Sequence, residues 1–332
     1  MADPPTVFVP LHHASRFVAH VGVIEEAGGQ VAFVDIDDSD KGRAALARAT
    51  AGAVGLDSFG ADDFAVAPHL RAIITCTTGV DPIDLEAATE HGVMVGNTPD
   101  LCIEEVADHT LMLVLACYRR LPRTVYETRS QAPTRDGAID TSEHWPRLRG
   151  QVAGLLGFGN IARAVATRCQ AFGLRVIACD PFVDPFLARK LDVELVEFDH
   201  VLATADYLCV HLPLNPETRH CLNAEAFARM KSTAFVINTA RGPIIDEPAL
   251  VAALQTGQIA GAGLDVTEIE PIAEDNPLLD IPNALLTPHS AGYSQEASRW
   301  GPESAMRCAA AVIQGGRPRS IQNPAVLERL KT

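Results

Sequence analysis

The sequence has few of the features that mark several classes of protein. Only four of its 27 Lys and Arg residues are lysines, and no basic cluster stands out against a net charge of −15. Nucleic-acid binding needs clustered basic side chains that displace counterions from phosphates, so the composition disfavours nucleic acid as a direct partner. The missing polybasic patch also disfavours binding to a membrane surface.

Long uninterrupted hydrophobic segments are missing as well. The richest apolar segment, Leu101–Tyr118, contains three acidic residues and a histidine, which makes it too polar to cross a bilayer. The first residues, Met1–Pro5, lack the basic and then apolar pattern of a secretory signal. We also expect no regulatory tail after the last helical pattern. We therefore expect a cytoplasmic protein without a membrane partner.

The eight cysteines form no Cys-x-x-Cys pair, and most of them stand in apolar runs, as Cys179 and Cys209 do. This usage predicts reduced, buried thiols and neither disulfides nor zinc ligands. No bound metal is expected. The adjacent His12 and His13 follow the first apolar run, and we interpret them as histidines of a surface loop.

Short apolar runs alternate with longer helical patterns along most of the chain, which is typical of α/β proteins with parallel sheets. The expected strands are Thr6–Val9, Val31–Val34, Ala53–Leu56, Ala72–Cys76, Val93–Val95, Val152–Leu156, Arg175–Cys179, Tyr207–Val210, Ala234–Asn238, Gly261–Asp265 and Ala284–Leu286. The expected helices include Ile103–Arg120, Ile161–Phe172, Asp199–Thr204, Glu247–Gln255 and Gln295–Gln314.

The clearest motif follows the run Val152–Leu156 and has the form G-x-G-x-x-A. Gly157 permits a tight turn, Gly159 permits close approach to a pyrophosphate, and Ala162 permits close packing of the following helix on the strand. The free N–H groups at the start of that helix favour phosphate binding. A lone motif of this kind also arises by chance in glycine-rich turns, so its context decides.

That context is a second strand that ends at Asp180, 23 residues after Gly157. A carboxylate at this distance is suited to accept hydrogen bonds from the adenosine ribose hydroxyls. The same charge would repel a 2′-phosphate, and the adjacent Pro181–Val183 supplies no arginine to bind one. The pattern predicts NAD as the cofactor. The alternative for Asp180 is a solvated turn residue before proline.

We predict an α/β fold of two Rossmann-like, doubly wound parallel-sheet domains with a cleft between them. Residues 101–289 form the NAD-binding domain, and residues 1–100 together with 290–332 form a discontinuous substrate domain.

Three later strands are each followed by polar residues that suit proton and anion chemistry. These are Arg241, Glu270 and His289, and the carboxyl ends of parallel strands form the ligand crevice of such sheets. Each has a plainer interpretation as a loop cation, an acidic loop residue or a turn residue. Glu268 stands two residues before Glu270 and is the alternative acid.

In these motifs the chain resembles the D-isomer-specific 2-hydroxyacid dehydrogenase family over almost its whole length. The matching segments are 78–85, 157–162, 238–242, 263–266 and 287–289. The segments 106–111 and 293–298 are most similar to the C-terminal-binding-protein-like branch, which joins this fold to transcriptional corepression. Gly292 departs from that branch's tryptophan, and Thr75 and Cys76 are neutral where some relatives are basic, which suggests a different substrate pocket.

The resemblance implies a role for each matching residue. Arg241, Glu270 and His289 match the catalytic trio, and Glu270 is preferred over Glu268 because the family's acid precedes proline. The implied cofactor contacts are Thr78, Gly157, Phe158, Gly159, Asn160, Ile161, Asp180, His211, Leu212, Pro213, Thr239, Ala240, Asp265, His289 and Ala291. The implied substrate contacts are Thr78, Gly79, Val80, Arg241 and His289. The family also implies homodimers, and the irregular stretch Ser130–Gly150, which contains Trp145, and the apolar Leu111–Cys117 are candidates for the interface.

The chemistry of the trio agrees with these roles. A guanidinium fork can bind the carboxylate of a 2-oxo acid and polarise its ketone. An imidazole can exchange a proton with the alcohol oxygen, and a carboxylate on its other nitrogen favours the protonated form. We therefore predict an NAD-dependent oxidoreductase that interconverts a small anionic 2-oxo acid and a D-2-hydroxy acid. The alternatives are an NAD(H)-sensing, corepressor-like interaction protein and a dehydrogenase of an unusual anionic alcohol such as a phosphonate.

Overall fold

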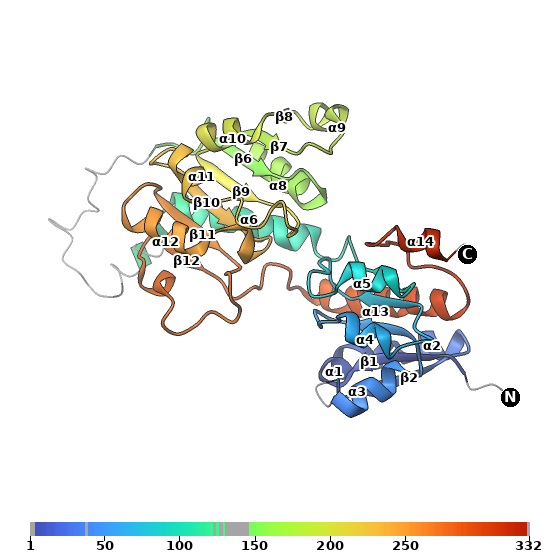
Figure 1. Cartoon of the computed structure of the whole chain (residues 1–332). Coiled ribbons are helices and arrows are strands. Elements are labelled where there is room, and N and C mark those ends of the chain that lie inside the picture. The colour runs from blue at the N-terminus through green and yellow to red at the C-terminus, as the bar shows by residue number, and fades with distance from the viewer. Residues whose placement is uncertain (1–3, 37–38, 122–123, 126–128, 130–145, 331–332) are drawn as a thin grey trace. The chain divides into compact units, whose positions relative to one another are not determined.

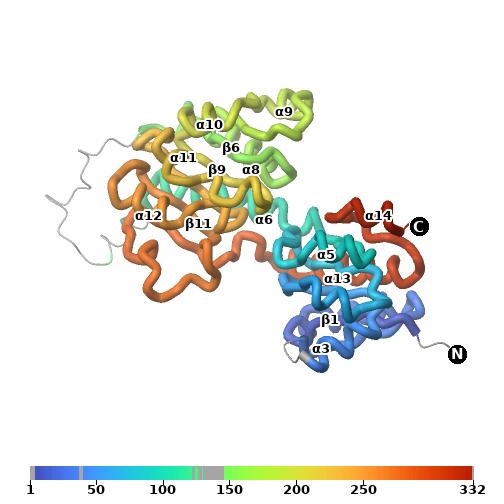
Figure 2. The backbone as a smooth tube through the Cα atoms, in the orientation of Figure 1, coloured from blue at the N-terminus to red at the C-terminus, as the bar shows by residue number. Residues whose placement is uncertain are grey.

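The computed structural model describes residues 4–36, 39–121, 124–125, 129 and 146–330. The chain divides into two compact units, residues 1–102 with 293–332 (unit 1) and residues 103–292 (unit 2). In Figures 1 and 2 the blue start and the red end of the chain both belong to unit 1, which is therefore discontinuous in sequence. Each unit is built on a parallel sheet of its own.

Unit 1 contains the first and last elements of the chain. In order they are β1 (Thr6–Pro10), η1 (Leu11–His13), α1 (Ala14–Phe17), η2 (Val18–His20), α2 (Val21–Glu26), β2 (Gln30–Val34), α3 (Ser39–Leu46), β3 (Ala49–Val54), α4 (Ala61–Ala65), β4 (Ala72–Thr75), α5 (Leu85–Glu90), β5 (Met94–Gly96), α13 (Gln295–Ile313) and α14 (Val326–Arg329).

The five strands of unit 1 pair in the order β2-β1-β3-β4-β5, all parallel. Successive residues of β1 point to opposite faces of the sheet, so Val7 and Val9 enter one core and Phe8 enters the other. The long α13 shares the first of these cores through buried residues such as Met306 and Ala309. The end of the chain therefore covers a sheet made by its beginning.

Strand β3 is the one strand of unit 1 whose position differs substantially from the expectation. It covers Ala49–Val54, whereas the pattern predicted Ala53–Leu56. Its first residues are small and have little strand propensity, but they are needed because the Phe8 ring lies against Gly52. A Cβ on Gly52 would lie 2.4 Å from that ring.

Unit 2 contains the elements between these two parts of unit 1. In order they are α6 (Ile103–Tyr118), β6 (Val152–Leu156), α8 (Asn160–Ala171), β7 (Arg175–Cys179), α9 (Pro185–Lys190), β8 (Glu194–Leu195), α10 (Phe198–Thr204), β9 (Tyr207–Val210), α11 (Ala224–Arg229), β10 (Phe235–Asn238), η4 (Gly242–Ile244), α12 (Glu247–Gln255), β11 (Gly261–Leu264), η5 (Pro277–Asp280) and β12 (Ala284–Leu286).

The seven parallel strands of unit 2 pair in the order β12-β11-β10-β9-β6-β7-β8. One core, under α6 and α8, includes Leu113 and Ala162, and the opposite core, under α10 to α12, includes Phe227 and Leu250. Strand β6 lies between β7 and β9, so the chain reverses its direction of strand addition there. Ligands of such sheets bind at this reversal, at the carboxyl ends of the strands.

The two segments considered for a homodimer interface differ in what the structure says of them. Most of the stretch Ser130–Gly150, including Trp145, lies outside the described residues. In the other segment, Leu111–Cys117, four residues are buried and three of them, Leu113, Val114 and Cys117, belong to the core of unit 2, while Met112 is 44% exposed. Much of this apolar face is therefore used within the unit itself.

All eight cysteines are free thiols, and four of them are buried. Within the described part of the chain, no helix combines the length and hydropathy that a membrane crossing requires.

Candidate active site

The turn after β6 has the geometry that a dinucleotide-binding loop needs. Gly157 has a φ of +87°, and a Cβ there would lie 2.7 Å from the carbonyl oxygen of His211. Glycine is therefore required both by the backbone angle and by the close approach of the loop after β9. The Gly157 N–H donates to the carbonyl of Cys179, which ties this turn to the end of β7.

The start of α8 offers donors to an anion. Gly159 is its N-cap and has no side chain to accept from the first N–H groups, and no acidic residue stands in the first turn. A Cβ on Gly159 would meet no heavy atom within 4 Å, so open space lies beside this position. Ala162 is buried against the sheet. The turn and the helix therefore fit the pyrophosphate of a dinucleotide.

Asp180 is held against this same turn. Its Oδ2 accepts a hydrogen bond from the backbone N–H of Phe158 at 2.8 Å, and its Oδ1 accepts from the N–H of Phe182 at 2.9 Å. These two bonds fix the carboxylate beside the Gly157–Gly159 segment. Each oxygen retains a lone pair that a ligand hydroxyl can use.

The loop after β9 contributes a half-buried, neutral imidazole whose Nε2 atom is buried. The backbone N–H of His211 donates to the carbonyl of Leu156 at 2.8 Å, which places the start of the His211–Pro213 segment next to the glycine-rich turn. Burial lowers the pKa of His211 to about 4. Its Nε2 is the one buried side-chain nitrogen or oxygen in the described residues that has no hydrogen-bond partner. An orphaned nitrogen next to the turn is consistent with a ligand contact.

The predicted acid and base are in contact. His289 follows β12, and its Nδ1 lies 2.8 Å from Oε2 of Glu270. Its backbone has a φ of +49°, and its N–H donates to the carbonyl of Asp265 at 2.7 Å. The other ring nitrogen, Nε2, has no partner among the described residues. This leaves His289 with one nitrogen oriented by a carboxylate and one nitrogen available for proton exchange.

The neighbouring acid has a different partner. Oε1 of Glu268 lies 2.7 Å from Nε2 of His220, and Oε2 of Glu268 accepts from the N–H of Glu247 at 3.2 Å. The two glutamates therefore point at different histidines. Of the two candidates, Glu270 is the one that contacts His289.

The pKa of His289 is raised above its ordinary value. The largest cause is the hydrogen bond to Glu270, which outweighs the opposing effect of burial. The charge of Glu270 also raises this pKa, whereas the positive charge of Arg241 lowers it, and Asp265 raises it slightly. Glu270 and Arg241 are thus both close enough to act electrostatically on His289.

The loop that carries Arg241 is fixed by the side chain of Asn238 at the end of β10. The Asn238 amide donates to the carbonyl of Arg241 and accepts from the N–H of Ala240, both at 2.9 Å. Gly242 then passes so close to the loop after β11 that a Cβ would lie 1.8 Å from the carbonyl oxygen of Thr267. These contacts fix the backbone from which the Arg241 guanidinium projects.

The carboxylate of Asp265 binds several groups of the loop that carries His289. This buried carboxylate accepts from the hydroxyl of Thr287 at 2.6 Å, from the N–H of Ser290 at 2.9 Å and from the N–H of Ala291 at 2.8 Å. Nε2 of His109 in α6 lies 3.4 Å from the same carboxylate and 2.9 Å from the Thr287 hydroxyl. The sequence predicts Asp265 and Ala291 as cofactor contacts, and in this structure they bind each other.

Two residues near the site, His109 and Thr110, were not predicted as site residues by the sequence analysis. His109 and Thr110 lie on α6, and the hydroxyl of Thr110 is 2.9 Å from that of Thr239. Only the shared segment 106–111 pointed to this part of the helix. The predicted contacts Thr78, Gly79 and Val80 belong to unit 1, in the loop after β4, where the Thr77 hydroxyl donates to the Gly79 carbonyl and the Asn97 amide donates to the Thr78 carbonyl.

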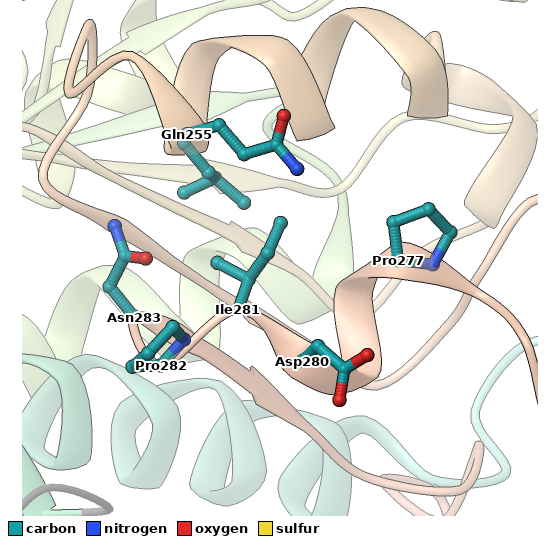
Figure 3. Close-up of a pocket in the computed structure, with 7 residues that line it drawn as sticks. Gln255, Pro277, Asp280, Ile281, Pro282 and Asn283 are labelled. Carbon is teal, nitrogen blue, oxygen red and sulfur yellow. The ribbon is translucent and has the colours of Figure 1, made fainter.

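The surface of unit 2 also has a pocket of about 450 Å³ near its edge strand (Figure 3). Its lining residues are Leu254, Gln255, Pro277, Asp280, Ile281, Pro282 and Asn283. Asn283 precedes β12, whereas His289 follows it, so the pocket lies at the amino end of the strand and the trio at the carboxyl end. The pocket is separate from the candidate active site.

Comparison with known proteins agrees with this geometry. Residues 111–291 match the family model described as D-isomer specific 2-hydroxyacid dehydrogenase, NAD binding domain. The D-3-phosphoglycerate dehydrogenase of Mycobacterium leprae is 37% identical, over 89% of this chain and 54% of that protein. The glyoxylate reductase of Thermofilum pendens is 37% identical, over 82% of this chain and 80% of that protein.

A crystal structure of D-lactate dehydrogenase from Aquifex aeolicus, complexed with NAD and lactic acid, is similar with a TM-score of 0.82 and 26% identity, over 98% of this chain and 97% of that one. The chain spans about half the length of the mycobacterial relatives that it matches. The match over residues 111–291 and the 37% identity to the Thermofilum glyoxylate reductase carry the assignment: this chain belongs to the D-isomer specific 2-hydroxyacid dehydrogenase family, whose cofactor is NAD(P).

Proposed function

We propose that this protein is an NAD-dependent dehydrogenase that interconverts a small 2-oxo acid and the corresponding D-2-hydroxy acid. The observation that carries the proposal is the 2.8 Å contact between His289 Nδ1 and Glu270 Oε2. It supplies an oriented proton donor at the carboxyl edge of a sheet that fits a dinucleotide. Family membership supports the same reaction class.

His289 is the proton donor when the ketone is reduced. Glu270 accepts the Nδ1–H and stabilises the imidazolium, so the proton that leaves comes from Nε2. That proton goes to the alkoxide oxygen formed from the ketone. In the reverse direction the neutral ring removes the hydroxyl proton at Nε2.

Arg241 binds the substrate carboxylate. A guanidinium is always charged and presents paired N–H donors that match a carboxylate, so it binds the acid and polarises the adjacent ketone together. Its loop is fixed by Asn238 and by the close passage of Gly242. Thr78, Gly79 and Val80 contribute further donors to the substrate in this proposal.

The cofactor supplies the hydride that reduces the ketone carbon. Gly157, Gly159 and the start of α8 would bind its phosphates, and Asp180 would accept from the adenosine ribose hydroxyls. The Asp180 carboxylate is held beside the turn by the Phe158 N–H, where it would repel a 2′-phosphate, so NAD is preferred over NADP. Thr239, Ala240 and Asp265 would line the nicotinamide, and His211–Pro213 would contact the adenine half.

The substrate class follows from the relatives and the trio. The similar proteins are named for glyoxylate, D-3-phosphoglycerate and D-lactate, which share a carboxylate next to an oxidisable or reducible carbon. Arg241 and His289 address that shared part of the molecule. The variable part is what distinguishes these substrates from one another.

A panel of 2-oxo acids tests the proposal. NADH oxidation is followed with short-chain, branched, phosphorylated and phosphonate-bearing 2-oxo acids, and the chirality of the product is determined. We expect turnover of at least one 2-oxo acid to a D-2-hydroxy acid, with NADH preferred over NADPH. Tight NADH binding without turnover on any of them would contradict the proposal and favour an NAD(H) sensor.

We also propose that the chain is a homodimer, as the family resemblance implies. Sedimentation velocity of the full chain measures this directly. A monomer at micromolar concentration would contradict it.

A further inference from the structure

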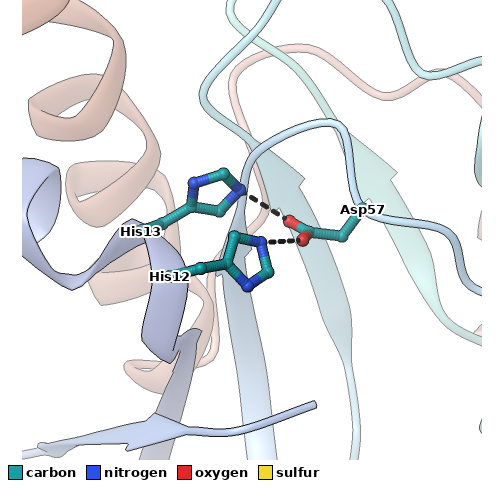
Figure 4. Close-up of side chains that lie close together, drawn as sticks. All are labelled: His12, His13 and Asp57. Atoms are coloured by element: carbon teal, nitrogen blue, oxygen red, sulfur yellow. Dashed lines mark hydrogen bonds and ion pairs between the residues drawn. The ribbon is translucent and has the colours of Figure 1, made fainter. Parts of the chain in front are cut away.

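Unit 1 brings together three side chains that the proposed reaction does not use. Figure 4 shows the imidazoles of His12 and His13 turned toward the carboxylate of Asp57. Nε2 of His12 lies 2.8 Å from Oδ1 of Asp57, and Nε2 of His13 lies 3.2 Å from Oδ2. One donor atom from each residue lies within 4.8 Å of the other two.

The cluster is built by two neighbouring strands. β1 leads directly into η1, which carries both histidines, and β3 leads into the segment Gly55–Asp57. A Cβ on Gly55 would lie 2.2 Å from Nε2 of His13, so only glycine lets the ring reach this position. The N–H of Gly55 donates to Oδ2 of Asp57 at 2.8 Å and fixes the carboxylate.

The carboxylate of Asp57 is buried beside the two imidazoles. The side chain of Asp57 is 5% exposed, and its partners among the described residues are the two imidazoles and the Gly55 N–H, without a lysine or an arginine in an ion pair. A buried carboxylate of this kind favours a cationic partner.

We propose that His12, His13 and Asp57 bind one divalent transition-metal ion, with Zn²⁺ favoured. Two imidazole nitrogens and one carboxylate oxygen are the donor set of three-ligand zinc sites, in which a further position takes a water or an anionic ligand. Zn²⁺ imposes no d-electron geometry, which suits two ligands from adjacent residues. The side chain of His12 is 46% exposed and gives the ion a route from solvent.

The hydrogen bond between a ligand residue and the surrounding backbone also fits this assignment. Metal-bound carboxylates are commonly held by a further hydrogen bond, as Asp57 is by Gly55. The site lies at the carboxyl ends of β1 and β3, and β4, which pairs with β3, leads into the loop with Thr78–Val80. The coordination position that the three side chains leave open on the ion suits an oxygen anion, such as a carboxylate or a phosphate.

Cobalt binding tests the site without reference to turnover. Untagged full-length protein is stripped with a chelator and titrated with Co²⁺, and the visible absorption of Co²⁺ with fewer than six ligands is recorded. Zn²⁺ is then added in competition. His12→Gln and Asp57→Asn each remove a ligand, and His69→Gln changes an exposed histidine of unit 1 as the matched control.

We expect one Co²⁺ per chain in the wild type and in His69→Gln, displaced by one equivalent of Zn²⁺, and no such band in His12→Gln or Asp57→Asn. Circular dichroism and NADH binding show whether each variant is folded, and His12→Gln changes a side chain that is 46% exposed. A wild type without the band, or a band that survives in folded His12→Gln, would show that these residues form only a hydrogen-bonded cluster and would overturn the proposal.

Discussion

Glu268 and Glu270 stand two residues apart in the acidic loop and contact different histidines, and only one of the two pairs takes part in the proposed reaction. Glu270 contacts His289 and Glu268 contacts His220, at 2.8 and 2.7 Å. The sequence placed both acids in one loop but could not show which histidine each one reaches. Only the family pattern of an acid before proline preferred Glu270, and the side-chain geometry supports that preference.

Replacing Glu270 should move the pH dependence of reduction. The reaction needs the imidazolium, so the rate is present below the pKa of His289 and is lost as the pH rises through it. Glu270 raises that pKa, so Glu270→Gln should lower it and move the alkaline limit of kcat/KM for the ketone to lower pH. The pH profiles of the wild type and the variant measure the shift.

Glu268→Gln is the matched control, because it weakens the contact with His220 instead. Its profile should follow that of the wild type. Equal shifts in the two variants would show that the loop responds as a whole, and no shift in Glu270→Gln would remove Glu270 from the proton path.

A single glycine determines how closely two loops of the site pack. Gly242→Ala would set a Cβ 1.8 Å from the Thr267 carbonyl, so we expect the variant to lose about 1–3 kcal/mol of stability or more. Gly22→Ala in α2 meets nothing within 4 Å and should gain about 0.5–1 kcal/mol. Thermal denaturation midpoints of the two variants measure these effects. A Gly242→Ala protein as stable as the wild type would contradict the close passage.

At the scale of elements, how well a strand could be predicted depended on what buries it. β6 covers Val152–Leu156, as the pattern predicted, because aliphatic side chains of this central strand enter the cores on both faces, Val152 and Leu156 on one and Leu155 on the other. The prediction for β3 was displaced because the small residues of this strand have little strand propensity. Gly52 must be small because the Phe8 ring lies against it. The two-residue β8 was missed because it has no apolar run.

The junction of β7 with the glycine-rich turn should determine cofactor preference. Asp180→Asn keeps an oxygen acceptor for a backbone N–H and removes the charge that would oppose a 2′-phosphate. We expect the ratio of kcat/KM for NADH to that for NADPH to fall by about tenfold, which corresponds to about 1.4 kcal/mol. Asp184→Asn, at the N-cap of α9, should leave the ratio unchanged because asparagine also caps.

A ratio of kcat/KM values unaffected by Asp180→Asn would show that another residue excludes the 2′-phosphate.

The residues around Asp265, such as His109 on α6, could not be predicted from the sequence at this scale. Their side chains meet only because strands and helices far apart in the chain converge, as do those of Asp57 and the two histidines of unit 1.

At the scale of the whole molecule, the chain is acidic, but parts of the candidate site are locally positive. The net charge of −15 disfavours polyanions, while Arg241 and the start of α8 provide positive potential for small anions. The family was predictable from the combined motifs. The relation to the C-terminal-binding-protein-like branch stays a prediction, as do the substrate's side chain and the dimer.

Thiol reactivity should report the folding of both units. Burial raises the pKa of Cys117 and Cys169 to about 12 and raises those of Cys76 and Cys209 as well, so these four thiols have almost no thiolate when folded. We expect all eight thiols to react with an aromatic disulfide reagent in denaturant. In the native protein these four should remain unreacted, and their rapid native labelling would contradict the packing described.

The central claim is that His289 transfers the proton while the rest of the site binds the cofactor. His289→Ala and His220→Ala are compared by stopped-flow NADH oxidation with a 2-oxo acid found in the panel, and by NADH titration. We expect His289→Ala to lose about 10²–10⁴ in kcat with NADH affinity retained, and His220→Ala to stay near the wild type. An unchanged kcat in His289→Ala would contradict the account.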